Sequence, residues 1–160
     1  MKKIFLAVFL LIGTTSSFAQ LNSILNQQEK DAILYMREEE KLARDVYNLL
    51  YDKWGINPFN NIRQSEQVHM DRMKTLITTY QLEDPVMKNL DMQGVFTNVQ
   101  LQQYFNELST TGGRSLIDAL KVGAKIEELD IADLEERIKQ TQKQDIISSY
   151  NFLKMASENH

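Results

Sequence analysis

The segment SEQVHM (65–70) places two side chains that bind divalent metals, Glu66 and His69, three residues apart. On a helix, residues at i and i+3 lie on the same face, so both side chains can reach one ion. The chain contains two histidines, and the second is its last residue, His160. Glu-x-x-His on an arbitrary helix is more often an exposed pair than a metal site. Metal-binding residues on the buried faces of the other helices would favour the metal site.

The helix expected over 27–54 carries a carboxylate within its apolar stripe. Its apolar residues recur every three to four positions, and Glu40 falls in this stripe between Met36 and Ala43. We therefore predict that Glu40 points into the core. The rest of the charged run REEEK (37–41) is expected to form a solvated face, which applies to Glu38, Glu39 and Lys41.

A further long helix is expected over 116–141 and is rich in acidic residues. Its apolar stripe, which begins with Leu116 and Leu120, continues through Glu127. Asp130 flanks the same line, about one turn beyond Glu127. Most other acids of this helix must face solvent, so Glu127 is the carboxylate expected on its buried face.

The last expected helix, over 145–160, places Ser157 and His160 on its apolar face. Each of the long helices therefore carries one or two polar residues on its buried stripe. An unpaired buried carboxylate is costly, so it shifts its pKa, pairs with a cation or binds metal. Several carboxylates and imidazoles that converge in a core are best neutralised by divalent cations, and these ligands suit iron, manganese or zinc.

Helical periodicity recurs along the chain, and no strand-like alternation of useful length occurs. Long helices are expected over 27–54, 61–80, 116–141 and 145–160, with a short helix over 99–109. Short loops make the first two and the last two antiparallel neighbours, and a long crossover joins the two pairs. This pattern predicts an all-α, ferritin-like antiparallel four-helix bundle whose crossover carries the short fifth helix.

Residues 1–19 have the features of a secretory signal peptide. They start with Lys2 and Lys3, continue in an apolar run, and end in small residues up to Ala19. We therefore expect cleavage after Ala19, a bundle domain over 20–160, and a periplasmic or secreted protein. No other apolar run is long enough to span a membrane.

The composition limits the chemistry that the chain can perform. The net charge is −4, and loss of the signal peptide removes two lysines and no acid. An acidic surface argues against nucleic acid as a partner. The absence of cysteine excludes disulfides and thiolate-bound metal centres, so any electron donor must be a separate molecule.

Three segments resemble rubrerythrin-type proteins of the ferritin-like superfamily: EKLARDVY (40–47), SEQVHM (65–70) and GAKIEELD (123–130). More broadly, residues 33–160 resemble a bacterial and archaeal ferritin-like family whose domain has no assigned function. This resemblance implies a metal centre with five matched ligands: Glu40, Glu66, His69, Glu127 and His160. Tyr47, at the end of the first segment and two turns from Glu40, is expected to be a core residue, with a contact to a metal ligand as the alternative.

The last helix departs from the rubrerythrin pattern, which places Glu-x-x-His there. Ser157 stands where that pattern has the Glu, and Asp130 could supply the missing carboxylate. The departure favours a single metal or an asymmetric pair of metals over a symmetric di-iron centre.

The resemblance implies an exported ferritin-like metal-binding protein, such as a di-iron oxidase, a ferroxidase or a peroxide-consuming protein. Iron is the expected metal, with manganese and zinc as alternatives. Oxygen or peroxide and a second copy of the chain in a homodimer are the expected partners. Two alternatives stay open: a non-catalytic bundle with a structural or buffering metal site, and a metal-free interaction module.

Overall fold

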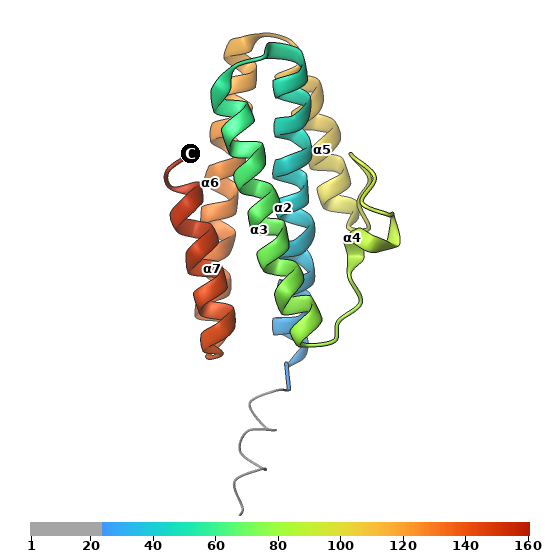
Figure 1. Cartoon of the computed structure of the whole chain (residues 1–160), viewed down its shortest axis with the longest axis vertical. Coiled ribbons are helices and arrows are strands. Elements are labelled where there is room, and N and C mark those ends of the chain that lie inside the picture. Colours follow the sequence, from blue (N-terminus) through green and yellow to red (C-terminus); the bar gives the residue numbers. More distant parts are fainter. Residues whose placement is uncertain (1–23) are drawn as a thin grey trace, which may run out of the picture.

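The computed structural model describes residues 24–160, which form six helices and no strand (Figure 1). The helices are α2 (Gln27–Trp54), α3 (Asn57–Thr79), α4 (Pro85–Lys88), α5 (Val99–Gly112), α6 (Leu116–Lys139) and α7 (Gln144–Ser157). The all-helical prediction is therefore confirmed for this range. The predicted signal peptide over 1–19 lies outside the described residues. Within 24–160, no helix is both long and apolar enough to cross a membrane.

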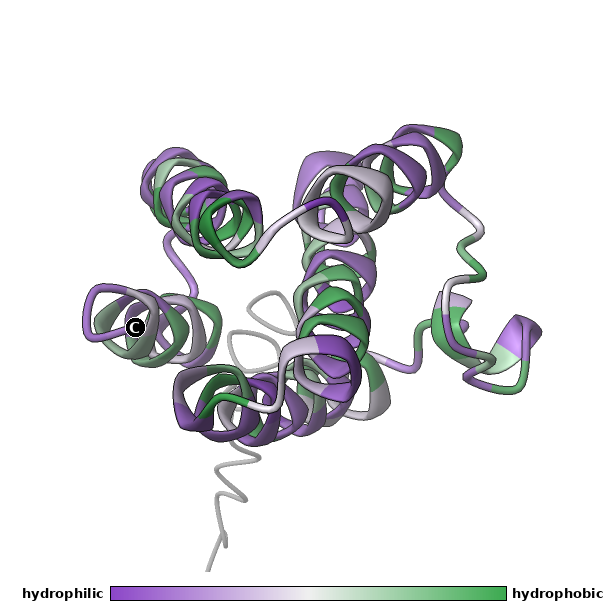
Figure 2. Cartoon of the chain, turned by 90° about the horizontal axis from the view of Figure 1, so that it is seen from above, coloured by the Kyte–Doolittle hydropathy of each residue, from purple (hydrophilic) through white to green (hydrophobic). Residues whose placement is uncertain are grey.

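Four long helices close into a ring of contacts: α2 touches α3, α3 touches α7, α7 touches α6, and α6 touches α2. In Figure 1, each of them runs antiparallel to both of its neighbours in this ring. Seen end-on, hydrophobic residues of the helices gather toward the interior (Figure 2). The crossover between α3 and α6 carries α4 and α5, which both contact α2. Helix α2 is thus covered by four other helices.

Helix α2 begins and ends where the sequence predicts. The Asn26 side chain accepts a hydrogen bond from the backbone N–H of Glu29 at 2.8 Å, and the Glu29 carboxylate accepts one from the Asn26 N–H at 2.9 Å. Gly55 ends the helix with φ +65°, in the left-handed region that favours glycine. Pro58 lies in the first turn of α3, where its missing N–H leaves no hydrogen bond unmade.

Other boundaries differ from the predicted ones. Helix α3 begins at Asn57 instead of 61, because proline is compatible with the first turn of a helix. Helix α5 continues to Gly112, whose carbonyl accepts a hydrogen bond from the Trp54 indole at 2.9 Å. The short helix α4 lies within the segment that the sequence indicates only as a connection.

The buried face of α6 is rotated from the predicted stripe. Leu116 and Leu120 are 38% and 48% exposed, because α7 has 14 residues against 24 in α6 and does not reach these first turns (Figure 1). The buried residues of α6 are Ala119, Val122, Gly123, Ile126, Glu127, Asp130 and Leu134. Glu127 is buried as predicted, and the rotation also brings Asp130, which was expected only to flank the stripe, inside the bundle.

Two separate hydrophobic clusters fill the interior. One cluster contains Met36 of α2 and Leu134 of α6, and the other contains Leu42 of α2 and Ile126 of α6. On α2, the first cluster ends at Met36 and the second begins at Leu42. Buried polar residues of α2, α3 and α6 occupy the interval. We call this set the polar layer: Glu40, Glu66, His69, Glu127 and Asp130.

The prediction that Glu38, Glu39 and Lys41 face solvent is wrong. Their exposed fractions are 4%, 8% and 0%. A run of five residues extends around the full circumference of a helix. Because α2 is covered by α3, α4, α5 and α6, this run has no face left for solvent.

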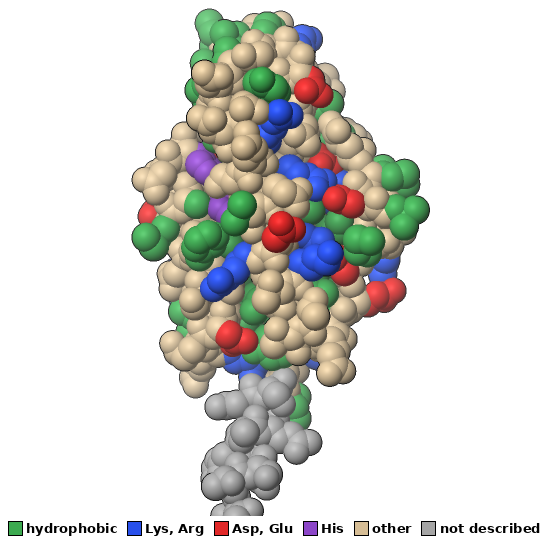
Figure 3. Space-filling model, viewed as in Figure 1, with side chains coloured by type: hydrophobic (Ala, Val, Ile, Leu, Met, Phe, Trp, Pro, Cys, Tyr) green, Lys and Arg blue, Asp and Glu red, His purple; other side chains and the backbone are tan. Residues whose placement is uncertain are grey.

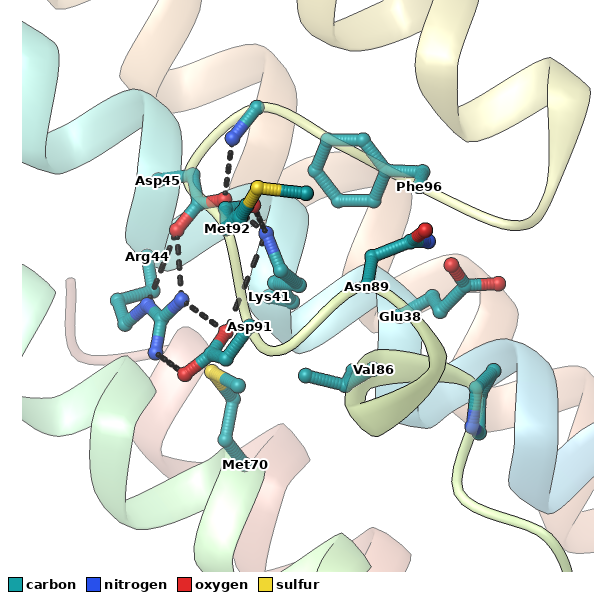
Figure 4. Close-up of polar contacts among 12 residues, drawn as sticks. Glu38, Lys41, Arg44, Asp45, Met70, Val86, Asn89, Asp91, Met92 and Phe96 are labelled. Carbon is teal, nitrogen blue, oxygen red and sulfur yellow. Dashed lines mark hydrogen bonds and ion pairs between the residues drawn. The ribbon is translucent and has the colours of Figure 1, made fainter.

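Lys41 and Arg44 anchor the crossover to α2 (Figure 4). The Lys41 ammonium pairs with the Asp45 carboxylate and donates a hydrogen bond to the Met92 carbonyl at 2.8 Å. The Arg44 guanidinium lies 2.8 Å from Asp45 and 2.7 Å from Asp91. Buried charges of α2 therefore hold the middle of the crossover in place.

Glu38 and Arg37 hold the parts of the crossover on either side. The Glu38 carboxylate accepts hydrogen bonds from the backbone N–H groups of Thr97 and Asn98, the latter at 3.0 Å. Asn98 caps α5, so this negative charge lies at a helix N-terminus, where it is favourable. Arg37 pairs at 3.0 Å with Asp84, which caps α4.

We expect Asp45→Asn to destabilise the protein by about 3 kcal/mol, because the fully buried Lys41 ammonium then keeps only the Asp91 carboxylate, 4.0 Å away. The free energy of unfolding from urea titrations measures this. The control, Lys125→Gln, breaks an exposed pair with Glu107 and should cost less than about 1 kcal/mol. Equal losses in the two variants would contradict the anchoring role.

Candidate metal centre

The structure brings the predicted ligands together from four segments of the bundle. Glu40 comes from α2, Glu66 and His69 from α3, Glu127 from α6, and His160 from the residues after α7. Glu40, Glu66 and His69 are at most 2% exposed. These residues form two overlapping sets of three. Within each set, one ligand atom from every residue lies within 4.8 Å of the ligand atoms of the other two. We call these sets the first and second triads.

The first triad consists of Glu40, Glu66 and His69. The His69 Nδ1 atom lies 2.8 Å from Glu66 Oε2 and 3.1 Å from Glu40 Oε2. The i, i+3 spacing on α3 places Glu66 and His69 on one helical face, as the sequence predicts. Glu40 reaches the same point from the neighbouring antiparallel helix.

The second triad consists of Glu66, Glu127 and His160. The His160 Nδ1 atom lies 3.2 Å from Glu66 Oε1 and 3.1 Å from Glu127 Oε2. This triad is nearer to solvent, since 12% of the His160 side chain is exposed. Figure 3 shows histidine atoms at the surface beside α7. The two imidazole rings are stacked with centroids 5.9 Å apart.

Glu66 is the residue that the two triads share. Its Oε2 atom faces His69, and its Oε1 atom faces His160. A carboxylate that presents one oxygen to each of two ligand sets has the arrangement of a bridging ligand between two cations. The geometry therefore assigns the central position to Glu66, where the sequence alone indicates only one of five ligands.

Asp130 and Ser157 form a hydrogen-bonded pair at the edge of the triads. The Ser157 hydroxyl donates to Asp130 Oδ2 at 2.7 Å, and both side chains are buried. Asp130 belongs to neither triad, but of all charged neighbours it raises the pKa of Glu40 most. The serine that replaces the expected glutamate on α7 thus orients a carboxylate on α6.

Two carboxylate oxygens of the polar layer have no hydrogen-bond partner. Glu40 Oε1 and Asp130 Oδ1 are buried and make no hydrogen bond. Within residues 24–160, the ion pairs of the triad carboxylates are with the two histidines and not with lysine or arginine. Buried acceptors without donors are rare and costly, and a divalent cation would satisfy them. The residues present therefore fit a metal.

The pKa values reflect this concentration of negative charge. Burial raises the pKa of Glu40 well above its usual range, and the charges of Asp130 and Glu66 raise it further. Burial, with Glu66 and Glu127 nearby, raises the pKa of Asp130 to about 7 despite the hydrogen bond from Ser157. Without metal, some of these carboxyl groups hold protons near neutral pH.

The pKa values of Glu66 and His160 are instead shifted in the direction that favours their charged forms. Burial alone would raise the pKa of Glu66, but hydrogen bonds with His160 and His69 lower it to about 2. Partial burial would lower the pKa of His160, but hydrogen bonds with Glu127 and Glu66 raise it to about 10. In the metal-free protein, a charged His160 therefore supplies part of the missing positive charge.

Tyr47 fills both of the roles that the sequence leaves open for it. It is 1% exposed, as expected of a core residue, and its hydroxyl also donates to Glu127 Oε1 at 2.6 Å. Gly123 leaves room for it, since a Cβ there would lie 3.1 Å from the hydroxyl. The seven-residue spacing from Glu40 to Tyr47, two helical turns on one face, is the signal that indicates this proximity.

The fold and the site define an all-helical protein whose buried carboxylates and imidazoles lie between two hydrophobic clusters. The chain belongs to the family described as "Uncharacterized protein domain (DUF2202)", which matches residues 29–160. The match includes both triads and Asp130. It confirms the predicted likeness to a family whose domain has no assigned function, whereas the ferritin-like, rubrerythrin-related part of that interpretation stays a prediction.

A relative from Methanocaldococcus jannaschii, "Uncharacterized protein MJ0754", is 50% identical over 136 residues, which are 85% of this chain and 72% of the relative. The crystal structure of the hypothetical protein MJ0754 from Methanococcus jannaschii DSM 2661 has a similar fold, with a TM-score of 0.83 and 48% identity. That similarity covers 86% of this chain and 77% of the other. The polar layer therefore lies within a fold that an experimental structure also shows.

We expect the metal-free protein to lose stability as the pH rises from about 5 to about 8. The pKa of Asp130 is about 7, against 3.8 for an unperturbed Asp, so the folded state binds more protons and stability falls with rising pH over that interval. The raised pKa of Glu40 acts in the same direction. The stabilisation from His160, whose pKa is about 10, is complete below 6.5 and is lost as the pH rises toward 10.

Thermal melting in the presence of a chelator, followed by circular dichroism across this pH range, measures the effect. Asp130→Asn should flatten the slope, because the asparagine does not titrate. The control Asp118→Asn changes an acid near the start of α6, far along the helix from the polar layer, and should keep the slope. A melting temperature of the unaltered protein that rises from pH 5 to 8 would contradict the raised pKa values.

Proposed function

We propose that this chain is a ferritin-like metalloprotein that binds two metal ions in its polar layer, one at each triad. The observation that carries the proposal is the position of Glu66, which offers one oxygen to each triad. The unpaired oxygens of Glu40 and Asp130 also support a cation at this place. The four long antiparallel helices and the crossover that carries α4 and α5 support the ferritin-like arrangement.

Iron is the metal that we propose, because carboxylate and imidazole ligands suit iron, although they also suit manganese and zinc. Glu40 and His69 would hold one ion, Glu127 and His160 the other, and Glu66 would bridge them. A pair of bound irons supplies one-electron redox chemistry toward oxygen or peroxide. We therefore propose an oxidase, a ferroxidase or a peroxide-consuming activity.

The protein itself contributes orientation and exclusion of water. The Tyr47 hydroxyl fixes one oxygen of Glu127, and the Ser157 hydroxyl fixes one oxygen of Asp130. Hydrophobic clusters on both sides of the polar layer keep the surroundings of the ligands apolar. Hydrogen bonds that orient ligands tune metal affinity and the properties of the bound metal.

The features of residues 1–19 support export, so we propose a periplasmic or secreted protein. The chain has no cysteine, and the electrons for any repeated turnover must come from a separate donor. A homodimer is part of the same proposal, and size-exclusion chromatography with light scattering measures it.

A second candidate is a bundle without redox activity, in which the site buffers metal or only stabilises the fold. The hydrogen bonds between the imidazoles and the three triad carboxylates favour it, because they hold the ligands in place without an ion. Consumption of oxygen or peroxide by the ferrous protein distinguishes the two candidates. If dialysed protein holds no metal and a chelator leaves its melting temperature unchanged, a metal-free interaction module is the better description.

The shared position of Glu66 predicts a graded loss of metal. Glu66→Gln should remove both ions, because each triad loses a carboxylate. His69→Ala should lose only the ion of the first triad, and His160→Ala only that of the second. Elemental analysis of iron-loaded, gel-filtered protein gives the number of ions per chain.

Glu128→Gln is the matched control, because Glu128 is the exposed neighbour of Glu127 on α6 and should leave the metal content unchanged. Circular dichroism shows whether each variant stays folded. If a chain with both Glu66→Ala and His69→Ala keeps the full metal content, the centre is not at these triads.

Ser157→Ala should weaken metal binding about 10–100-fold, because the buried Asp130 carboxylate loses the hydroxyl that orients it. Ser157→Glu should bind at least as tightly as the unaltered protein, because it returns a carboxylate to α7. Competition with a chelating dye measures the affinities. Ser148→Ala, at an exposed serine of the same helix, is the control, and an equal affinity in Ser157→Ala and Ser148→Ala would mean that Asp130 has no role in binding.

A further inference from the structure

Glu39 is a buried carboxylate that the proposed centre does not use. It is 8% exposed, and its Oε2 atom is buried without a hydrogen-bond partner. It precedes Glu40 on α2 and points in another direction, so its neighbours come from α5 and α6 instead of α3. Such a side chain costs stability unless it has a ligand or a function.

A small closed cavity lies between α2, α5 and α6, next to the polar layer. Its volume is about 20 Å³, enough for a single water molecule or ion. Glu39 and Asp130 both line it, and the rest of its wall is mainly apolar. Each of these carboxylates has a buried oxygen without a partner, namely Glu39 Oε2 and Asp130 Oδ1. Both of these residues, each with an unpaired carboxylate oxygen, thus line a space for one ion, and a cation there would offer each carboxylate a partner.

A second, open pocket of about 300 Å³ leads from the surface to the same side chains. Glu39, Tyr104 and Leu129 line both the open pocket and the closed cavity. Asp133 stands at the outer end, where Arg137 lies 3.8 Å from it. Carboxylates thus follow one another from the surface inward: Asp133, Glu39 and Asp130.

We propose that Glu39 and Asp130 form a cation-binding site on an access route, along which divalent metal passes from the groove between α2, α5 and α6 to the centre. This inference rests on the proposed function. The two cavities supply the space, and the row of carboxyl groups supplies oxygen ligands that an arriving divalent cation binds in exchange for their protons. Asp130 connects the cavity with the proposed centre, since it lines the cavity and its charge also raises the pKa of Glu40.

The test measures how fast metal-free protein takes up Co²⁺, from the growth of the visible absorption bands of the bound ion after rapid mixing. Glu39→Gln keeps the size of the side chain and removes the carboxyl group that can bind a cation, so uptake should slow about tenfold while the number of bound ions stays the same. Glu128→Gln, which removes a charge from the exposed face of α6, should leave the rate unchanged.

A second variant tests the space instead of the charge. Leu129 is 37% exposed and lines both cavities, so Leu129→Trp narrows the route without burying a larger side chain in the core, and uptake should slow again. Ala124→Trp, at an exposed position of α6, is its control.

The outcomes separate this inference from the proposed function. If the unaltered protein binds no Co²⁺, the metal centre itself fails. If it binds Co²⁺ and both Glu39→Gln and Leu129→Trp take it up at the unaltered rate, the access route is wrong and metal enters elsewhere, with the exposed edge of His160 as the alternative. A lower number of bound ions in Glu39→Gln would make Glu39 a ligand of the centre and would likewise overturn the route.

Discussion

The rest of the structure depends on one constraint: several carboxylates lie in an interior from which water is excluded. Glu40, Glu66, Glu127 and Asp130 occupy the layer between two hydrophobic clusters. Within residues 24–160, the three triad carboxylates form ion pairs with two imidazoles, and the Tyr47 hydroxyl donates one further hydrogen bond to Glu127. Desolvation and mutual repulsion destabilise this layer unless positive charge is supplied. Whatever cation enters the layer therefore stabilises the bundle, so the proposed function and the stability of the fold depend on the same groups.

Helix α2 contributes both to the stability of the fold and to the proposed metal centre. Its charged run is enclosed on all sides, and successive residues point to different neighbours as the helix turns. Arg37, Glu38 and Lys41 hold the crossover, Glu40 belongs to the first triad, and Glu39 faces the cavity toward α6. The crossover in turn covers α2 and keeps water from the buried charges.

Much of this arrangement could be predicted from local patterns. Helical periodicity indicated the long helices, and the Glu-x-x-His spacing placed Glu66 and His69 on one buried face. The burial of Lys41 could not be predicted, because an amphipathic pattern assumes a solvent-facing side, and α2 has none at that point. The predicted burial of Leu116 and Leu120 was wrong because α7 does not cover them. The periodicity of α6 contains no information about where α7 ends.

The pairing of Asp130 with Ser157 joins two residues 27 positions apart on adjacent antiparallel helices. From the sequence, Ser157 counts as a missing ligand that Asp130 could replace, but the hydrogen bond between them could not be predicted because they lie on different helices. In the structure, the hydroxyl holds Asp130 Oδ2 and leaves Oδ1 free beside the cavity. A glutamate at 157 would bring a fourth carboxylate to the triads; the serine instead keeps Asp130 between the triads and the cavity. The proposed asymmetry of the centre and the proposed access route therefore both involve the serine at 157 and its contact with Asp130.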